Sequence, residues 1–160
     1  FTVSLGQGTG GFLAGGLCGQ DHWQTLLSLP ALLGVLVSVL VTTGFYPLTQ
    51  IYQREEDRRR GDVTFAVRWG ERSFPFTIGC LVAAAVAAGY LAWRYFDLWN
   101  VGLLMAGLLV LAGLVFAWWR DFDEAQIRQN YQRVMRIGYL MGGGFTAFIG
   151  YHLIHRAMAV

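Results

Sequence analysis

Five long apolar runs dominate the pattern of hydrophobic and polar positions along the chain. They contain no Asp, Glu or Arg, and they cover residues 1–20, 22–53, 73–93, 98–119 and 137–155. A helix that crosses the hydrocarbon core of a bilayer needs about 20 mainly apolar residues at a rise of about 1.5 Å each. The pattern therefore predicts an all-α polytopic bundle with five transmembrane helices, over about residues 1–19, 28–52, 73–94, 98–119 and 137–155.

Composition supports this interpretation and narrows the function. Hydrophobic residues make up 55% of the 160 residues, charged residues only 14%, and the mean hydropathy is +0.44. An ordinary soluble domain, a disordered chain and a disulfide scaffold are all disfavoured by these values. The net charge of +2 does not suggest a nucleic-acid partner. We expect one transmembrane domain over residues 1–160, with membrane lipid around it.

Arginine is unevenly distributed between the two sides of such a bundle. If the five helices alternate, the stretches 54–72 and 120–136 lie on the same side, and they carry ten of the 12 basic residues. Short loops rich in Lys and Arg stay in the cytoplasm. The sequence therefore predicts cytoplasmic loops at 53–72 and 120–136 and a carboxy terminus outside. Residues 121–136 are expected to form an interfacial helix that leads into the last span.

Candidate chemistry begins where the second run meets the first polar stretch. Pro47 removes a backbone donor and should kink or break the helix there. Gln50, Gln53 and Asp57 follow at i, i+3 and i+7, a spacing that places side chains on one helix face. Oxygen ligands of this kind suit Mg²⁺, which takes one or two protein carboxylates and further ligands from a substrate phosphate.

The neighbouring charges allow two interpretations. Arg58, Arg59 and Arg60, together with Arg68, could hold the negative charge of a diphosphate. Alternatively, the arginines only satisfy the positive-inside rule, and the acids at 55–57 pair with them in water.

The segment 50–70 resembles the second Asp-rich motif of the UbiA superfamily of intramembrane prenyltransferases. That motif has an Asn or Asp, then Asp-x-x-x-Asp, an Arg, a Gly, and a closing Thr-Leu-Ala/Pro-Val-Arg-Leu-Gly run. Asp57 matches the second Asp of the pair, Glu55 an acid two residues before it, Gly61 the glycine, and residues 64–70 the closing run. The five predicted spans also resemble the second half of that family's roughly nine-helix fold.

Two departures from the family pattern matter. Gln53 stands in place of the first Asp, and Gln50 in place of the Asn before it, so an amide oxygen replaces a carboxylate. The family's first Asp-rich motif has no counterpart in these 160 residues. We therefore expect the chain to be a carboxy-terminal half, with the missing amino-terminal half of the bundle as a partner that supplies other metal ligands.

The resemblance implies a set of site residues. The catalytic candidates are Asp57 and Glu56. The Mg²⁺ ligands are expected among Gln50, Gln53, Glu55, Glu56 and Asp57. The diphosphate partners are expected to be Arg58, Arg59 and Arg68. Residues that could face substrate are Tyr46, Tyr52, Asn130, Tyr131 and Arg136, although residues 120–136 could equally form a solvated connector.

The activity implied is Mg²⁺-dependent transfer of a prenyl group from an isoprenoid diphosphate to a hydrophobic acceptor, either aromatic or lipid, by the full-length chain. Gln53 leaves open a family member without catalysis, which would serve as an isoprenoid-binding or assembly subunit in the membrane. A small transporter is a weaker alternative, since the apolar runs carry no charged residue where a coupling site would lie.

Overall fold

All regular elements of the described residues are helical. The computed structural model describes residues 2–19, 27–95 and 97–158. The helices are α1 (Thr2–Gly19), α2 (Leu29–Phe45), α3 (Leu48–Ile51), α4 (Arg54–Arg60), α5 (Phe65–Trp69), the 3₁₀ helix η2 (Gly70–Arg72), α6 (Ser73–Tyr95), α7 (Leu98–Arg120) and α8 (Ile127–Met158). The all-α fold class is therefore confirmed.

Three helical stretches within the described part of the chain are long and apolar enough to cross a membrane. They are Leu29–Ile51, Phe65–Tyr95 and Leu98–Arg120, and each contains an 18-residue segment with a mean hydropathy of 1.9, 1.8 and 2.4, respectively. These stretches correspond to the second, third and fourth spans expected from the sequence. The other two expected spans lie in helices α1 and α8. Five membrane crossings remain a prediction.

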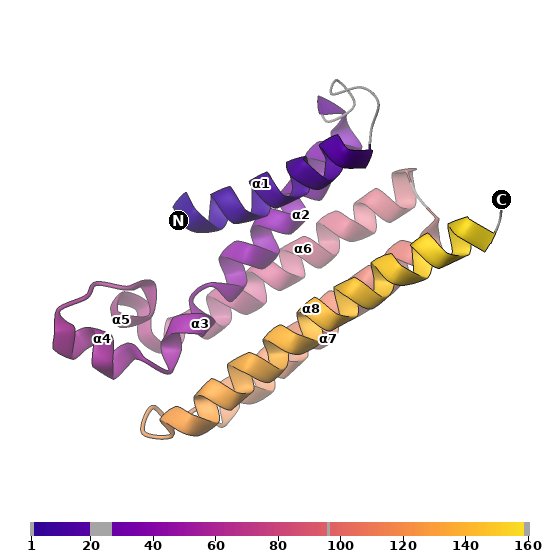
Figure 1. Cartoon of the computed structure of the whole chain (residues 1–160). Helices are drawn as coiled ribbons and strands as arrows, with labels where there is room; N and C mark the ends of the chain where they lie inside the picture. Colours follow the sequence, from indigo (N-terminus) through magenta and orange to yellow (C-terminus); the bar gives the residue numbers. More distant parts are fainter. Residues whose placement is uncertain (1, 20–26, 96, 159–160) are drawn as a thin grey trace.

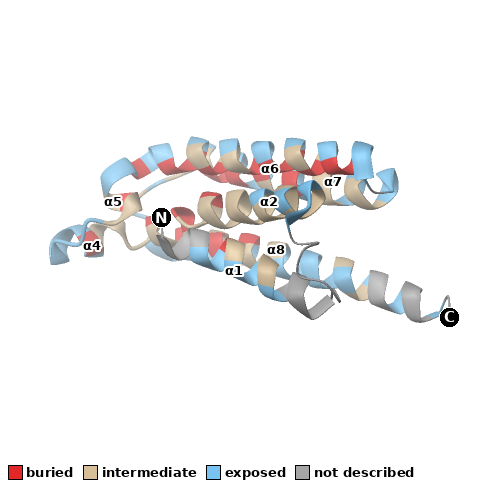
Figure 2. Cartoon of the chain, turned by 90° about the horizontal axis from the view of Figure 1, so that it is seen from above, coloured by how far each residue is buried: buried red, intermediate tan, exposed pale blue. Residues whose placement is uncertain are grey.

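The core lies along α6, which packs between α2 and α7 (Figures 1 and 2). The buried face of α6 consists largely of small residues, among them Ala84, Ala85 and Ala88. Small side chains let helix backbones approach closely in an apolar environment. Helix α2 approaches α6 closely at Gly44, whose carbonyl accepts a 2.6 Å hydrogen bond from Thr77 Oγ1. A Cβ atom at Gly44 would lie 2.6 Å from the Cβ of Cys80, so the contact requires glycine.

Helix α8 differs from the expectation for residues 121–136. A helix leading into the last span was expected over the whole segment; the structure is helical there from Ile127 onward, where one continuous helix begins that extends to Met158 beside α7 (Figure 1). The residues between 127 and 136 contain no proline or glycine that would end a helix. Val134 and Ile137 bury the first part of α8 against the core, whereas most described residues after Gly138 are exposed (Figure 2).

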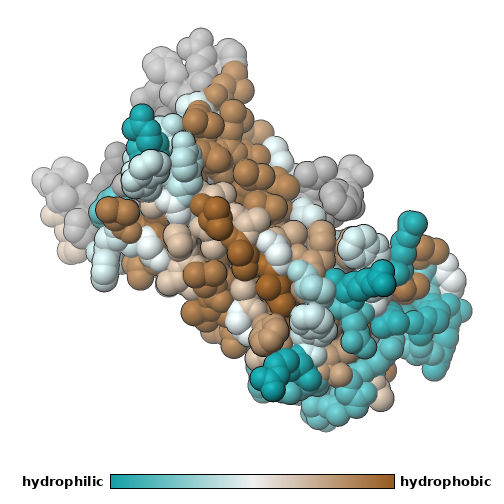
Figure 3. Space-filling view, turned by 180° about the vertical axis from the view of Figure 1, so that it is seen from behind, coloured by the Kyte–Doolittle hydropathy of each residue, from teal (hydrophilic) through white to brown (hydrophobic). Residues whose placement is uncertain are grey.

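Both arginine-rich stretches lie at one end of the molecule. Helix α4 and the loop between α7 and α8 meet there, where Arg54 forms an ion pair with Glu124 (Figure 1). Figure 3 shows hydrophilic surface gathered at this end and hydrophobic surface over the helices beyond it. This arrangement agrees with the expectation, drawn from alternating helices, that the two polar stretches lie on the same side of the bundle.

Candidate functional site

The chain changes direction twice just after the apolar part of α2. Helix α2 ends at Phe45, Pro47 precedes the four-residue α3, and Gln53 precedes α4 with φ −104° and ψ 8°. The break near Pro47 was expected, because proline has no N–H to donate. The second break separates Gln50 from Asp57, so the inference that Gln50, Gln53 and Asp57 share one helix face is wrong.

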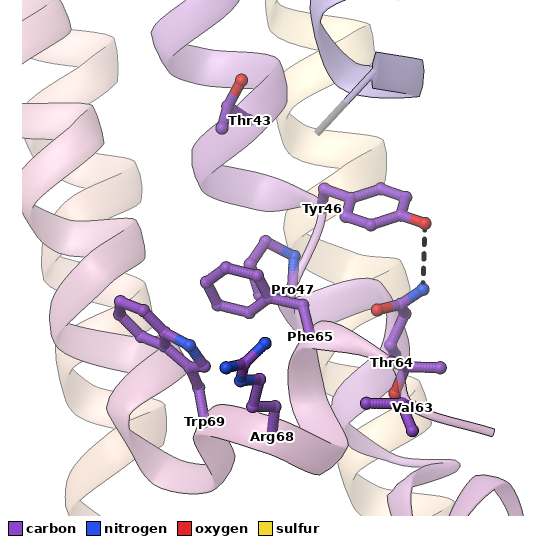
Figure 4. Close-up of a pocket in the computed structure, with 9 residues that line it drawn as sticks. Thr43, Tyr46, Pro47, Val63, Thr64, Phe65, Arg68 and Trp69 are labelled. Atoms are coloured by element: carbon purple, nitrogen blue, oxygen red, sulfur yellow. Dashed lines mark hydrogen bonds between the residues drawn. The ribbon is translucent and has the colours of Figure 1, made fainter. Parts of the chain in front are cut away.

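A pocket of about 540 Å³ lies between the end of α2 and α5 (Figure 4). Its wall combines aromatic and aliphatic side chains with a few polar groups. It is lined by Thr43, Tyr46, Pro47, Gln50, Val63, Thr64, Phe65, Arg68 and Trp69. Phe65 and Trp69 lie 4.8 Å apart between ring centroids, which gives one side of the pocket an aromatic surface.

Two oxygen atoms of the pocket have no hydrogen-bond partner within the described part of the chain. Gln50 donates through Nε2 to the Tyr46 hydroxyl at 3.1 Å (Figure 4), but its Oε1 is buried and unpartnered. The hydroxyl oxygen of Thr43 is likewise buried and has no hydrogen-bond partner among the described residues. Buried polar atoms are normally satisfied, so these oxygens are available to a ligand, an ion or water.

Arg68 is the cation of this pocket. It is exposed, it lies between the aromatic residues of α5 in sequence, and it forms no ion pair with any residue described. A guanidinium group offers several N–H donors in a planar fork that matches phosphate oxygens. Arg68 can therefore bind an anion without first giving up a carboxylate partner.

Asp57 lies next to the pocket rather than in its wall. It is 7% exposed, and its Oδ2 accepts a 3.2 Å hydrogen bond from the Thr64 hydroxyl. The same hydroxyl oxygen accepts from Val67 N at 3.3 Å and so caps α5. Thr64 lines the pocket, which places Asp57 one hydrogen bond from the pocket wall.

The turn after α4 fixes this arrangement. Asp62 N donates to Asp57 O at 2.9 Å and Gly61 N donates to Arg58 O at 3.2 Å, with Gly61 at φ 79°. This is the glycine-terminated helix end known as the Schellman motif. It returns the chain from α4 directly to Thr64 at the start of α5.

The other two acids of α4 face solvent and are paired. Glu55 accepts from Arg58 at 2.7 Å and lies 3.4 Å from Arg59 Nε, while Glu56 pairs with Arg60. These pairs are local, since their members are three or four residues apart on one helix. Pairing in water, the alternative left open by the sequence, describes Glu55 and Glu56 in this structure.

The expected Mg²⁺ ligands are thus distributed over different surroundings. Gln50 lies in the pocket, Asp57 is buried beside it, and Glu55 and Glu56 lie on the exposed side of α4. Among the residues that the structure describes, no three His, Cys, Asp or Glu side chains lie close enough together to hold a metal ion. The donor chemistry still fits Mg²⁺ in part, because the unpartnered Gln50 oxygen and the Asp57 carboxylate are both hard oxygen ligands.

The remaining candidates fall in three places. Tyr46 lines the pocket, whereas Tyr52 packs edge-on against Tyr131 of α8 with centroids 5.2 Å apart. Asn130 is 2% exposed; it accepts from Trp118 Nε1 at 3.0 Å and donates to Asp123 O at 2.8 Å. Its polar atoms therefore hold the α7–α8 connection together, and a contact with substrate remains untested.

Arg136 lies elsewhere, in a smaller cavity of about 300 Å³ between α7 and α8. Sequence reasoning had not singled out Thr64 or Glu124 as site residues. A Thr just before a short helical segment is an N-cap signal that could have identified Thr64.

Comparison with known proteins gives one match. The family model described as "UbiA prenyltransferase family" matches residues 2–140 of this sequence, a range that includes the pocket, α4 and the start of α8. Neither a curated protein nor a solved structure matches the chain.

Proposed function

Because the chain belongs to the UbiA prenyltransferase family, we propose that it transfers a prenyl group from an isoprenoid diphosphate to an aromatic or lipid acceptor. The observation that carries this proposal is the pocket at the end of α2. It combines an aromatic wall with the guanidinium of Arg68 and the Oε1 atom of Gln50, neither of which has a partner among the described residues. A prenyl diphosphate has the matching features: a charged diphosphate and an apolar chain.

Each residue of the pocket has a role in this proposal. Arg68 binds the diphosphate and stabilises the negative charge that grows on it as the carbon–oxygen bond breaks. Phe65 and Trp69 cover the first isoprene units and exclude water from the prenyl cation. Tyr46 orients the Gln50 amide through their hydrogen bond. Thr64 holds Asp57 beside the diphosphate position.

Asp57 and Gln50 are the proposed Mg²⁺ ligands, with Gln53, Glu55 and Glu56 as further candidates. The chemistry that Mg²⁺ supplies when bound is neutralisation of the leaving diphosphate. Arg58 and Arg59 are proposed as additional diphosphate partners. Their exposed pairs with Glu55 are of a kind worth about 0–1 kcal/mol, so exchange for a diphosphate is energetically accessible.

The proposal includes a membrane topology. Family membership and three apolar helices identify an integral membrane protein. We propose five crossings, with α4 and the α7–α8 loop in the cytoplasm and the carboxy terminus outside. In intact cells, a single cysteine at Ala125 should be shielded from a membrane-impermeant maleimide, and one at Asp97, an exposed residue just before α7, should react. The reverse pattern would overturn the orientation.

The resemblance also supports a division of labour. We propose that the chain acts as the carboxy-terminal half of the bundle, together with an amino-terminal half that carries the first Asp-rich motif. Activity measurements therefore belong in the full-length protein.

The test is binding of radiolabelled geranyl diphosphate to the full-length protein in detergent, with and without Mg²⁺. Arg68→Ala should weaken binding about 10- to 150-fold, since a hydrogen bond to a charged group is worth about 1.5–3 kcal/mol. Arg72→Ala is the matched control, because Arg72 is exposed, lies four residues further on in η2 and does not line the pocket. It should change affinity less than about twofold, as expected for a screened surface charge.

Two outcomes would contradict the proposal. Equal binding by wild type and Arg68→Ala would remove the pocket from the diphosphate site. Binding without prenyl transfer to any aromatic or lipid acceptor would favour a non-catalytic isoprenoid-binding subunit instead.

A further inference from the structure

Three segments that are distant in the sequence meet at the side chain of Arg54. Arg54 is the first residue of α4, Gly70 begins η2, and Glu124 belongs to the loop between α7 and α8. Arg54 Nη1 lies 3.4 Å from Glu124 Oε2. The Arg54 side chain is 17% exposed, whereas those of Arg58, Arg59 and Arg60 are 46–75% exposed. Arg54 is therefore the least exposed arginine of α4.

Gly70 makes room for the Arg54 guanidinium. A Cβ atom at Gly70 would lie 3.1 Å from Arg54 Nη1 and 3.2 Å from both Cζ and Nη2, closer than side chains normally approach. The guanidinium thus lies close to both the backbone of Gly70 and the carboxylate of Glu124. Arg54 Nε is buried without a hydrogen-bond partner among the described residues. Within that part of the chain, the carboxylate of Glu124 is the counter-ion of the Arg54 guanidinium.

Glu124 is held in place by the folded loop around it. Both Asp123 carboxylate oxygens accept hydrogen bonds at 3.0 Å, from Ala125 N and Gln126 Nε2. The Asp123 carbonyl accepts from Asn130, which in turn accepts from Trp118 of α7. These hydrogen bonds connect the loop to both α7 and α8, and they fix the backbone on either side of Glu124.

Helix α4 needs such an external contact. It has only seven residues, too few for a helix to be stable alone in water. It is held in its middle by the Asp57–Thr64 hydrogen bond and at its end by the turn at Gly61. At its start, after the break at Gln53, Arg54 provides the contact. Glu124 Oε1 also lies 3.9 Å from Arg58 Nη1, so one carboxylate faces two successive turns of α4.

From these contacts we infer that the Arg54–Glu124 ion pair positions α4, and that it does so to hold Asp57 beside Thr64 at the pocket. Arg54 and Glu124 are positioning residues, and neither touches substrate. The catalytic consequence rests on the proposed function, whereas the structural link between α4 and the α7–α8 loop does not.

Hydrogen exchange of the full-length protein in detergent tests the structural link without any ligand. Glu124→Gln keeps the shape of the side chain and removes its charge. It should speed exchange of the α4 amides roughly tenfold, the scale of losing one interaction with a charged group. The double variant Arg54→Glu with Glu124→Arg swaps the two charges and should restore slow hydrogen exchange in α4. The single variant Arg54→Glu should not restore it.

Asp121→Asn is the matched control. It removes an exposed ion pair with Arg133, at 3.9 Å, from the same loop without touching α4. Exchange in α4 should stay at the wild-type rate. The inference would be overturned if hydrogen exchange in α4 were unchanged in Glu124→Gln. It would also be overturned if the charge-swapped double variant exchanged its α4 amides as fast as Arg54→Glu alone.

A second readout separates positioning from a purely structural role. Glu124→Gln should raise the Mg²⁺ concentration needed for half-maximal diphosphate binding about five- to tenfold, because Asp57 is less well held. The charge-swapped double variant should return this Mg²⁺ concentration to the wild-type value. If wild-type protein binds no diphosphate, the proposed function fails, and the exchange data still decide whether the pair positions α4. If exchange responds but the Mg²⁺ dependence does not, the link to Asp57 is wrong.

Discussion

The Thr64 hydroxyl connects the cap of α5 to Asp57, so its removal tests the site geometry most directly. Thr64→Val keeps the size and branching of the side chain and deletes the oxygen. Two contacts are lost: the donation to Asp57 Oδ2 at 3.2 Å and the acceptance from Val67 N at 3.3 Å. The change affects α4 and α5 together, because one atom serves both.

The expected magnitude follows from these two contacts. Loss of a Thr N-cap costs about 0.5–2 kcal/mol, and a hydrogen bond to a charged group is worth about 1.5–3 kcal/mol. Both distances are at the long end of the usual range, so we take values near the lower limits, a total of about 2 kcal/mol. A free energy of about 2 kcal/mol corresponds to a roughly 30-fold change in a local opening equilibrium.

Hydrogen exchange measured by mass spectrometry on peptides spanning residues 54–72 provides the assay. Thr64→Val should raise exchange there roughly 30-fold and leave α6 and α7 unchanged. Thr64→Ser is the control, since it keeps the hydroxyl and loses one methyl group. Under the proposed function, Thr64→Val should also weaken geranyl diphosphate binding, and Thr64→Ser should preserve it. Wild-type exchange in Thr64→Val would refute the reasoning, because it would mean that the hydroxyl does not hold α4 to α5.

Further variants test the packing and the metal requirement. Gly44→Ala should destabilise the bundle by about 1–3 kcal/mol through overpacking, seen as a lower Tm in detergent, whereas Gly79→Ala, where a Cβ would meet nothing within 4 Å, should not. Asn130→Leu should lower the free energy of unfolding by about 2 kcal/mol or more because the Trp118 and Asp123 groups lose their partner; exposed Gln129→Leu should have little effect in the same SDS-unfolding titration. Asp57→Ala should abolish prenyl transfer by the full-length protein while membrane insertion, followed by fractionation, stays intact. Chelation of Mg²⁺ with EDTA should abolish transfer in wild type, and retained transfer would remove the metal from the proposal.

The sequence predicts the central part of the fold well for a physical reason. Residues in α2, α6 and α7 are selected by the bilayer or the core over about 20 positions each, so the apolar signal is strong and local. The break at Pro47 is equally local, since a missing N–H acts wherever proline stands. The helix bounds of α6 and α7, Ser73–Tyr95 and Leu98–Arg120, accordingly lie within one residue of the expected ends.

The site was harder to predict because its geometry depends on contacts between distant segments. Helical spacing placed Gln50 and Asp57 on one face, but the turn at Gln53 lies between them and no proline or glycine marks it. Likewise, Arg54 and Glu124 are 70 residues apart, and no periodic pattern relates them. Helix in residues 127–136 was expected, but the sequence did not show where it begins, since residues 121–126 carry the same polar character and lie outside α8.

The run of three arginines was the most conspicuous chemical signal in the sequence, and the structure assigns it mainly to local pairing. Arg58, Arg59 and Arg60 are spread over an exposed helix beside the acids at 55 and 56, an arrangement that satisfies their charge before any ligand arrives. Arg68 stands outside the run and has no such partner in the described structure, and its side chain lines the pocket. A cationic cluster fixed by membrane topology contributes a general positive potential, whereas specific recognition of an anion requires a donor that is unpaired and oriented. Under the proposed function, the arginine that matters most for diphosphate binding is therefore Arg68, which the sequence already indicated as a candidate together with Arg58 and Arg59.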